Sequence, residues 1–169
     1  MDAIALKDSP RASVGLRRAL AIAAIGVPLL CAAAALAVDG GAARRFLLLY
    51  VAPFFVAFFA WARIRVGELP RASRAAMAVD GLAVVLGAVR FVGGPVPFSG
   101  HMLFFAYSAL TTRSVPYLLL VLALAAQATW YKLAVWDDFT SWSLGIAAGA
   151  LLAGIRILVH RFTRRPSSP

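Results

Sequence analysis

Residues 142–159 read WSLGIAAGALLAGIRILV, an apolar run with a single charged side chain, Arg156, near its end. A helix that crosses a membrane needs about 20 predominantly apolar residues. The run therefore predicts a transmembrane helix, with the long Arg156 side chain reaching towards the headgroups. Gly145 and Gly149 lie four residues apart, and such a small-xxx-small pattern lets two helix backbones approach closely in lipid. The pattern indicates a helix–helix contact, and it leaves open whether the partner belongs to the same chain.

Five further apolar runs precede this one, at residues 19–38, 46–62, 75–89, 98–110 and 115–131. Of the 169 residues, 62% are hydrophobic and 14% are charged, whereas soluble domains are about 45–50% apolar and about 25% charged. This composition excludes a soluble domain, a disordered tail and a secreted disulfide scaffold. We therefore predict an all-α, polytopic integral membrane bundle of about six transmembrane helices. The membrane domain covers residues 19–160, between an N-terminal segment (1–18) and a C-terminal tail (161–169).

The basic residues favour one orientation of these helices. The 17 Lys and Arg side chains give the chain a formal net charge of +10, and most of them lie in short clusters between the apolar runs. With a cytoplasmic N-terminus, the outer loops carry only Arg44, Arg45, Arg90 and Lys132, which leaves 13 of the 17 on the cytoplasmic side. Cytoplasmic loops are enriched in Lys and Arg, so both termini are predicted to be cytoplasmic. Since these charges orient helices, we expect no nucleic acid partner.

One acidic residue, Asp80, lies inside an apolar run. Ionisable residues within membrane helices usually face the bundle and pair with another group. No second acid accompanies Asp80 within the runs, so we expect it to make a structural pair rather than to carry protons.

Most of the ionisable groups predicted on the outer side lie in two loops. Residues 90–101 read RFVGGPVPFSGH, and residues 130–142 read WYKLAVWDDFTSW. Ser99 is expected to be the N-cap of the following helix, whose free backbone N–H groups would suit a phosphate. His101, in the first turn, can protonate a leaving oxygen near neutral pH. The same residues also fit a simple turn followed by an interfacial histidine.

The segment PFSGH at residues 97–101, followed by an apolar helix, resembles the second motif of the type-2 phosphatidic acid phosphatase superfamily, usually PSGH. Residues 130–149, WYKLAVWDDFTSWSLGIAAG, occupy the position of that superfamily's third motif and end in the same small residues. The resemblance implies a six-helix membrane fold with lipid phosphatase activity. It also implies that His101 protonates the leaving group and that Arg90 lies where the first motif holds the phosphate.

Several positions depart from these motifs. Asp137 stands where the third motif has its nucleophilic histidine, Ser141 where it has its aspartate, and Tyr131 where it has its arginine. The only other histidine, His160, is expected at the opposite, cytoplasmic end. Ala83 occupies the lysine position of the first motif. A protein that resembles this superfamily but lacks its nucleophile is expected to have weak or lost phosphatase activity.

The predicted catalytic residues are His101 and Asp137, and the predicted phosphate-binding residues are Arg90, Ser99, Gly100 and Lys132. We expect them to converge at the outer face in a pocket for a phosphate or a lipid headgroup, without a metal or a cofactor. One alternative is an active phosphatase or phosphotransferase with His101 as the general acid. The other is a structural subunit that contacts other membrane proteins through the face with Gly145 and Gly149. The expected partners are membrane lipids, and the Ala- and Arg-rich composition favours the inner membrane of a bacterium.

Overall fold

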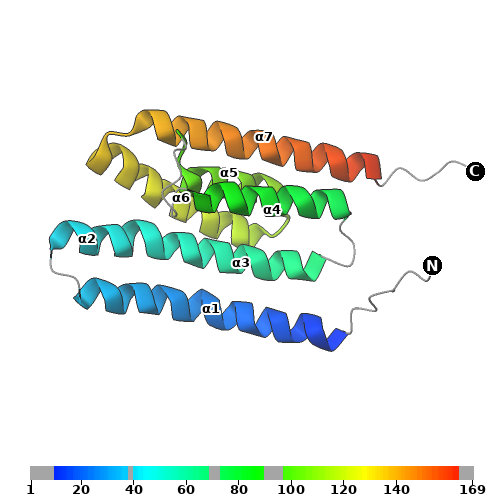
Figure 1. Cartoon of the computed structure of the whole chain (residues 1–169), viewed down its shortest axis with the longest axis horizontal. Coiled ribbons are helices and arrows are strands. Elements are labelled where there is room, and N and C mark those ends of the chain that lie inside the picture. Colours follow the sequence, from blue (N-terminus) through cyan, green and yellow to red (C-terminus); the bar gives the residue numbers. More distant parts are fainter. Residues whose placement is uncertain (1–9, 38–39, 69–72, 90–96, 164–169) are drawn as a thin grey trace, which may run out of the picture.

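A computed structural model describes residues 10–37, 40–68, 73–89 and 97–163 of the chain. Its elements in chain order are α1 (Pro10–Ala37), α2 (Gly41–Phe46), the π-helix η1 (Leu47–Val51), α3 (Ala52–Glu68), α4 (Arg74–Val89), α5 (Gly100–Thr111), α6 (Val115–Trp136) and α7 (Phe139–Thr163). Every element in these residues is helical, which confirms the predicted all-α class. Because α2, η1 and α3 form one continuous rod, the described chain contains six helical rods, one for each predicted apolar run (Figure 1).

Four of the rods are long and apolar enough to cross a membrane. They cover Val14–Ala37, Gly41–Glu68, Val115–Trp136 and Phe139–Thr163, and they identify the chain as an integral membrane protein. The other two rods, α4 and α5, have 16 and 12 residues. At about 1.5 Å per residue they are roughly 24 and 18 Å long, shorter than a hydrocarbon core of about 30 Å. The described residues therefore form six helical rods, while six membrane crossings stay a prediction.

Successive rods run in opposite directions, so α1 begins and α7 ends at the same end of the bundle (Figure 1). We call this the terminal end. The opposite end, where α6 ends and α7 begins, is called the site end. Helix α1 lies at the periphery and packs along α3 and η1, with most of its apolar surface exposed.

The short helix α5 forms the centre of the bundle. It packs against α3, α4, α6 and α7, and side chains on all its faces are buried, including Leu103, Phe104 and Tyr107. A helix that is apolar on every side is stable only where other elements surround it. A Cβ added at Gly100 would overlap the backbone oxygen of Gly87, so α4 and α5 cross at a pair of glycines.

The two glycines of α7 lie directly against α5. A Cβ added at Gly145 would lie 2.6 Å from the backbone oxygen of Ser99 and 3.0 Å from the Cβ of Met102. A Cβ at Gly149 would overlap the backbone oxygen of Leu103. The partner of the small-residue pattern is therefore α5 of the same chain. The expectation that this face contacts a second protein is wrong, because α5 already covers it.

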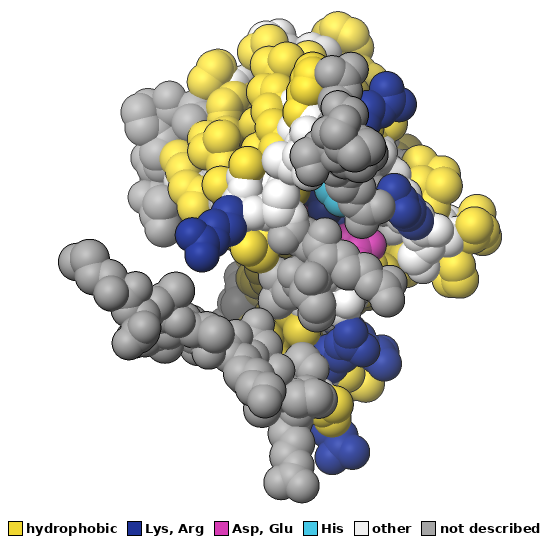
Figure 2. All heavy atoms as spheres, turned by 90° about the vertical axis from the view of Figure 1, so that its right-hand side faces the viewer, with side chains coloured by type: hydrophobic (Ala, Val, Ile, Leu, Met, Phe, Trp, Pro, Cys, Tyr) yellow, Lys and Arg dark blue, Asp and Glu magenta, His cyan; other side chains and the backbone are white. Residues whose placement is uncertain are grey.

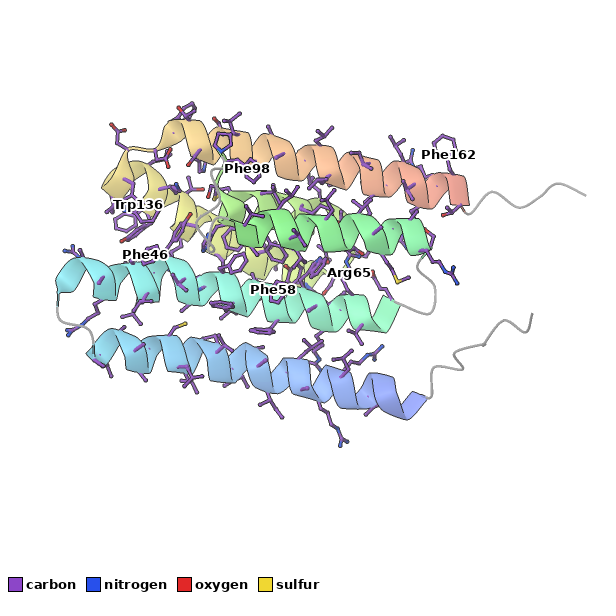
Figure 3. The ribbon with its side chains drawn as sticks, in the orientation of Figure 1. Phe46, Phe58, Arg65, Phe98, Trp136 and Phe162 are labelled. Atoms are coloured by element: carbon purple, nitrogen blue, oxygen red, sulfur yellow. The ribbon has the colours of Figure 1, made fainter. Side chains whose placement is uncertain are left out.

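At the terminal end, Asp80 of α4 connects three other helices, and its predicted pairing is confirmed. Its Oδ1 accepts a hydrogen bond from Arg156 Nε at 2.8 Å and another from the Tyr107 hydroxyl. Arg65 Nε lies 3.7 Å from the same oxygen, and Arg65 also pairs with Glu68. Figure 3 shows Arg65 of α3 among the helices on this side of the bundle. We call these five residues the Asp80 cluster.

The expectation that Arg156 extends towards the headgroups is wrong. Its side chain is 11% exposed and turns into the bundle towards Asp80. An unpaired carboxylate in an apolar interior is costly, so the ion pair holds the arginine inside instead of at the surface.

Gly149→Ala is expected to lower the free energy of unfolding by about 1–3 kcal/mol, because the added methyl group would overlap the backbone of α5. Gly154→Ala is the matched control on the same helix, since no atom lies within 4 Å of a Cβ at that position. Thermal unfolding of both variants in one detergent tests the expectation. Equal unfolding temperatures for the two variants would contradict the close approach of α7 to α5.

Candidate active site

Ser99 is the N-cap of α5, as predicted, but its hydroxyl does not cap the helix. The hydroxyl pairs instead with the Tyr50 hydroxyl, with 3.1 Å between the two oxygens. The backbone N–H of Ser99 donates to the carbonyl of Ser141 at 2.7 Å. This bond joins the described end of the first loop, residues 97–101, to the second loop at the site end.

The π-helix η1 places Tyr50 beside His101. π-helical turns inside α-helices are rare and occur frequently at functional sites. The side-chain N–H of Gln127 donates to the carbonyl of Leu49 at 2.9 Å, which ties this turn to α6. The rings of Tyr50 and His101 stack with their centroids 4.0 Å apart, and the Phe54 ring lies 4.6 Å from the imidazole. His101 is consequently buried between aromatic rings of η1 and α3.

A cavity of about 200 Å³ opens next to these residues. Its lining comprises Phe46, Tyr50, Gly87, Ser99, Gly100, His101, Lys132 and Trp136. We call it the α5 cavity. Phe46 and Trp136 come from α2 and α6, and their ring centroids lie 5.5 Å apart near the site end (Figure 3). The cavity thus has apolar aromatic walls and a small set of polar groups, a composition typical of small-molecule sites.

Lys132 supplies the cation of this cavity. The residue is 2% exposed, and its Nζ donates to Asp138 Oδ2 at 2.5 Å and to Ser141 Oγ at 2.9 Å. The ammonium also lies 5.0 Å from the centroid of the Trp136 ring. A lysine has three N–H donors, so these two bonds account for two of the three donors of Lys132. Hydrogen bonds from Lys132 and then from Ser141 lower the pKa of Asp138 to about 2.

The cavity brings together four of the six predicted site residues, namely Ser99, Gly100, His101 and Lys132. Asp137 is not part of its lining. It is exposed and ends α6 in the left-handed conformation, with φ of 50°. The carboxylate that reaches Lys132 belongs to the next residue, Asp138. Arg90 lies outside the described residues.

Several groups of the site do not stand out in the sequence. Tyr50 could have been noticed, because it is a hydroxyl in the otherwise strongly apolar run at residues 46–62. Phe46 and Gly87 carry no such signal, since an aromatic ring or a glycine in a membrane helix is ordinary. A tryptophan near the end of a membrane helix is equally ordinary, because tryptophans are enriched at membrane interfaces, so Trp136 does not predict the cavity either.

No known protein family, curated protein or solved structure matches this chain. The function is therefore argued from the chemistry of the α5 cavity. Within the described residues its lining offers two hydroxyls, an imidazole and an ammonium, and no carboxylate. Such a set donates hydrogen bonds and suits an anionic or oxygen-rich group.

Asp138→Asn is expected to lower the free energy of unfolding by about 3 kcal/mol, because it leaves the buried Lys132 ammonium without its counter-charge. Asp137→Asn is the matched control: the residue is exposed, an asparagine tolerates its left-handed conformation, and the expected change is within about 0.5 kcal/mol. Chemical unfolding in detergent at pH 7 measures both. Similar losses of unfolding free energy in the two variants would contradict a stabilising role of the Lys132–Asp138 ion pair.

The same pair predicts a pH dependence. The carboxyl of Asp138 has a lower pKa in the folded protein, about 2, than its ordinary value of 3.8. Its contribution to stability is therefore present above about pH 4 and is lost as the pH falls towards 2. This part of the acid destabilisation should be absent in Asp138→Asn.

Proposed function

We propose that this integral membrane protein binds the phosphate-bearing headgroup of a lipid in the α5 cavity. The observation that carries the proposal is the convergence of Lys132, His101, Ser99 and Tyr50 on one small cavity with aromatic walls. A phosphate accepts several hydrogen bonds, and an ammonium, an imidazole and hydroxyls are suitable donors. Phe46 and Trp136 provide apolar contacts for the acyl portion of a lipid.

Two further features support an anionic group in this place. The cavity lies at the start of α5, where the first backbone N–H groups of the helix and its dipole favour negative charge. The third N–H of Lys132 completes the set of donors.

We further propose that the protein is a divergent relative of the type-2 phosphatidic acid phosphatase superfamily with weak or lost hydrolytic activity. The PFSGH segment supports this relation, since His101 of that segment lines the cavity. The cavity lining in the described chain holds no second histidine, and Asp137 is not part of it. A phosphatase without a positioned nucleophile keeps only the contributions of binding and charge stabilisation. The alternative, an active enzyme in which His101 protonates the leaving group, uses the same cavity.

In lipid nanodiscs, the purified protein is expected to bind phosphatidate more weakly after His101→Ala, by about tenfold if one charge-assisted hydrogen bond is lost. His160→Ala is the matched control, because it changes the only other histidine, near the end of α7 at the terminal end. Quenching of tryptophan fluorescence reports the binding, since Trp136 lines the cavity. Equal affinity of both variants would contradict the proposed site.

Phosphate release from phosphatidate, phosphatidylglycerophosphate and polyprenyl pyrophosphate tests the catalytic part of the proposal. The expected rate is several orders of magnitude below that of an intact superfamily member, because the nucleophile is missing. Rapid release that disappears in His101→Ala but persists in His160→Ala would establish the active-enzyme alternative instead.

We also propose six membrane crossings with both termini in the cytoplasm and the site end outside. The strong bias of Lys and Arg towards one side supports this orientation. With Cys31 replaced by serine, an impermeant thiol reagent should label Thr140→Cys in intact cells but not Arg113→Cys. Both positions are exposed. Position 113 lies just before α6 at the terminal end, and position 140 lies in the first turn of α7 at the site end. Labelling at position 113 would overturn the orientation.

A further inference from the structure

A second concave region lies at the terminal end, between α1, α3 and α6. Its volume is about 440 Å³, and it shares no lining residue with the α5 cavity. Two arginines line it, Arg17 from α1 and Arg63 from α3. We call it the Arg17–Arg63 groove. Viewed from this end, Lys and Arg side chains are spread over the surface with little acidic area between them (Figure 2).

Carboxylates neutralise the arginines of the Asp80 cluster, but no carboxylate in the described lining neutralises the two arginines of the groove. Arg65 and Arg156 are buried and pair with Asp80 and Glu68. Arg17 and Arg63 are exposed, and within the described residues the groove lining contains no acidic side chain. A guanidinium group binds a phosphate through two parallel N–H bonds, so two of them on one groove form a strong anion site.

Gly67 of α3 allows the Arg17 guanidinium to lie against the helix. A Cβ added at Gly67 would be 2.6 Å from Arg17 Nη2 and 3.2 Å from its Cζ. The side chain of Arg17 therefore crosses from α1 to the surface of α3, near Arg63. This placement holds the cation within the groove even though the residue is exposed.

The rest of the groove is largely apolar, and the ends of the apolar spans in its lining put it at the level of the headgroups in the proposed topology. Ala60 and Ile64 of α3 and Pro116 and Leu120 of α6 line it. These residues belong to the end of α3 and the beginning of α6, and Arg17 lies in the first turn of the apolar span Val14–Ala37. Arginines at a helix end next to apolar side chains match a lipid, whose phosphate sits directly above its acyl chains.

We propose that the Arg17–Arg63 groove binds an anionic phospholipid of the leaflet at the terminal end. Its phosphate lies between the two guanidinium groups, and its acyl chains lie along Ile64 and Leu120. The charge bias of the chain assigns this end to the cytoplasmic leaflet, whose anionic lipids attract basic segments near the surface. A free phosphate lacks the acyl chains, so the apolar walls favour the lipid as the source of the anion. This inference does not rest on the function proposed for the α5 cavity.

The test compares lipid retention by the full-length protein, measured by native mass spectrometry after reconstitution in nanodiscs of phosphatidylglycerol or phosphatidylcholine. We expect preferential retention of phosphatidylglycerol, weakened about tenfold or more in the double variant Arg17→Gln, Arg63→Gln, because two charged contacts are lost. The matched control is Arg18→Gln, Arg113→Gln, which removes the same charge from exposed positions that do not line the groove. The control should retain the lipid within about twofold of the wild type.

Gly67→Ala is a second variant that keeps both arginines. Its methyl group displaces the end of the Arg17 side chain, so retention should fall by a smaller factor, about threefold, with an unchanged unfolding temperature. Equal losses in the groove variant and the control variant, or equal retention of the two lipids by the wild type, would overturn the proposal. Binding of glycerol 3-phosphate as tight as that of phosphatidylglycerol would overturn the lipid as the source of the anion.

Discussion

The contact on which the rest of the structure depends is the close approach of α7 to α5 along Gly145 and Gly149. Hydrophobic burial does not drive helices together in a membrane, because lipid tails are as apolar as the side chains themselves. Association relies on packing and polar contacts, and packing is closest where small residues let backbones touch. Gly145 meets the backbone of Ser99, and Gly87 of α4 meets Gly100. A 12-residue helix is thereby fixed in the middle of the bundle.

The α5 cavity and the Asp80 cluster both include residues from the ends of α5. Ser99, Gly100 and His101 at its beginning line the α5 cavity, while Tyr107 and Thr111 near its end bond to Asp80 and Arg65. Because α5 is short, its polar termini lie inside the bundle, where unsatisfied groups are costly. The ion pairs and hydrogen bonds at each end satisfy these groups, so the position of α5 fixes the α5 cavity and the Asp80 cluster towards opposite ends of the bundle.

The apolar runs were sufficient to predict the number of helices and their approximate positions, and the pairing of Asp80 followed from the cost of a charge in lipid. The burial of α5 could not be predicted, since an apolar side chain reads the same whether lipid or another helix surrounds it. For the same reason the sequence does not reveal which helix packs against Gly145 and Gly149. The choice between Asp137 and Asp138 as the partner of Lys132 depends on the left-handed turn at Asp137, which a sequence pattern does not reveal. The position of Tyr50 beside His101 likewise depends on the π-helical turn, which the sequence pattern does not reveal.

The two proposed anion sites differ in what stabilises their positively charged side chains. Lys132 is almost fully buried, and a buried ammonium is stable only with a counter-charge, here Asp138. The net charge of that pair is zero, so the ligand proposed for the α5 cavity would be selected by hydrogen-bond geometry and size. Arg17 and Arg63 are exposed and remain hydrated without a carboxylate, so the groove at the terminal end attracts anions by charge. Salt screens exposed charges far more than buried ones, so anion binding at the proposed groove should weaken with ionic strength more than binding in the proposed α5 cavity.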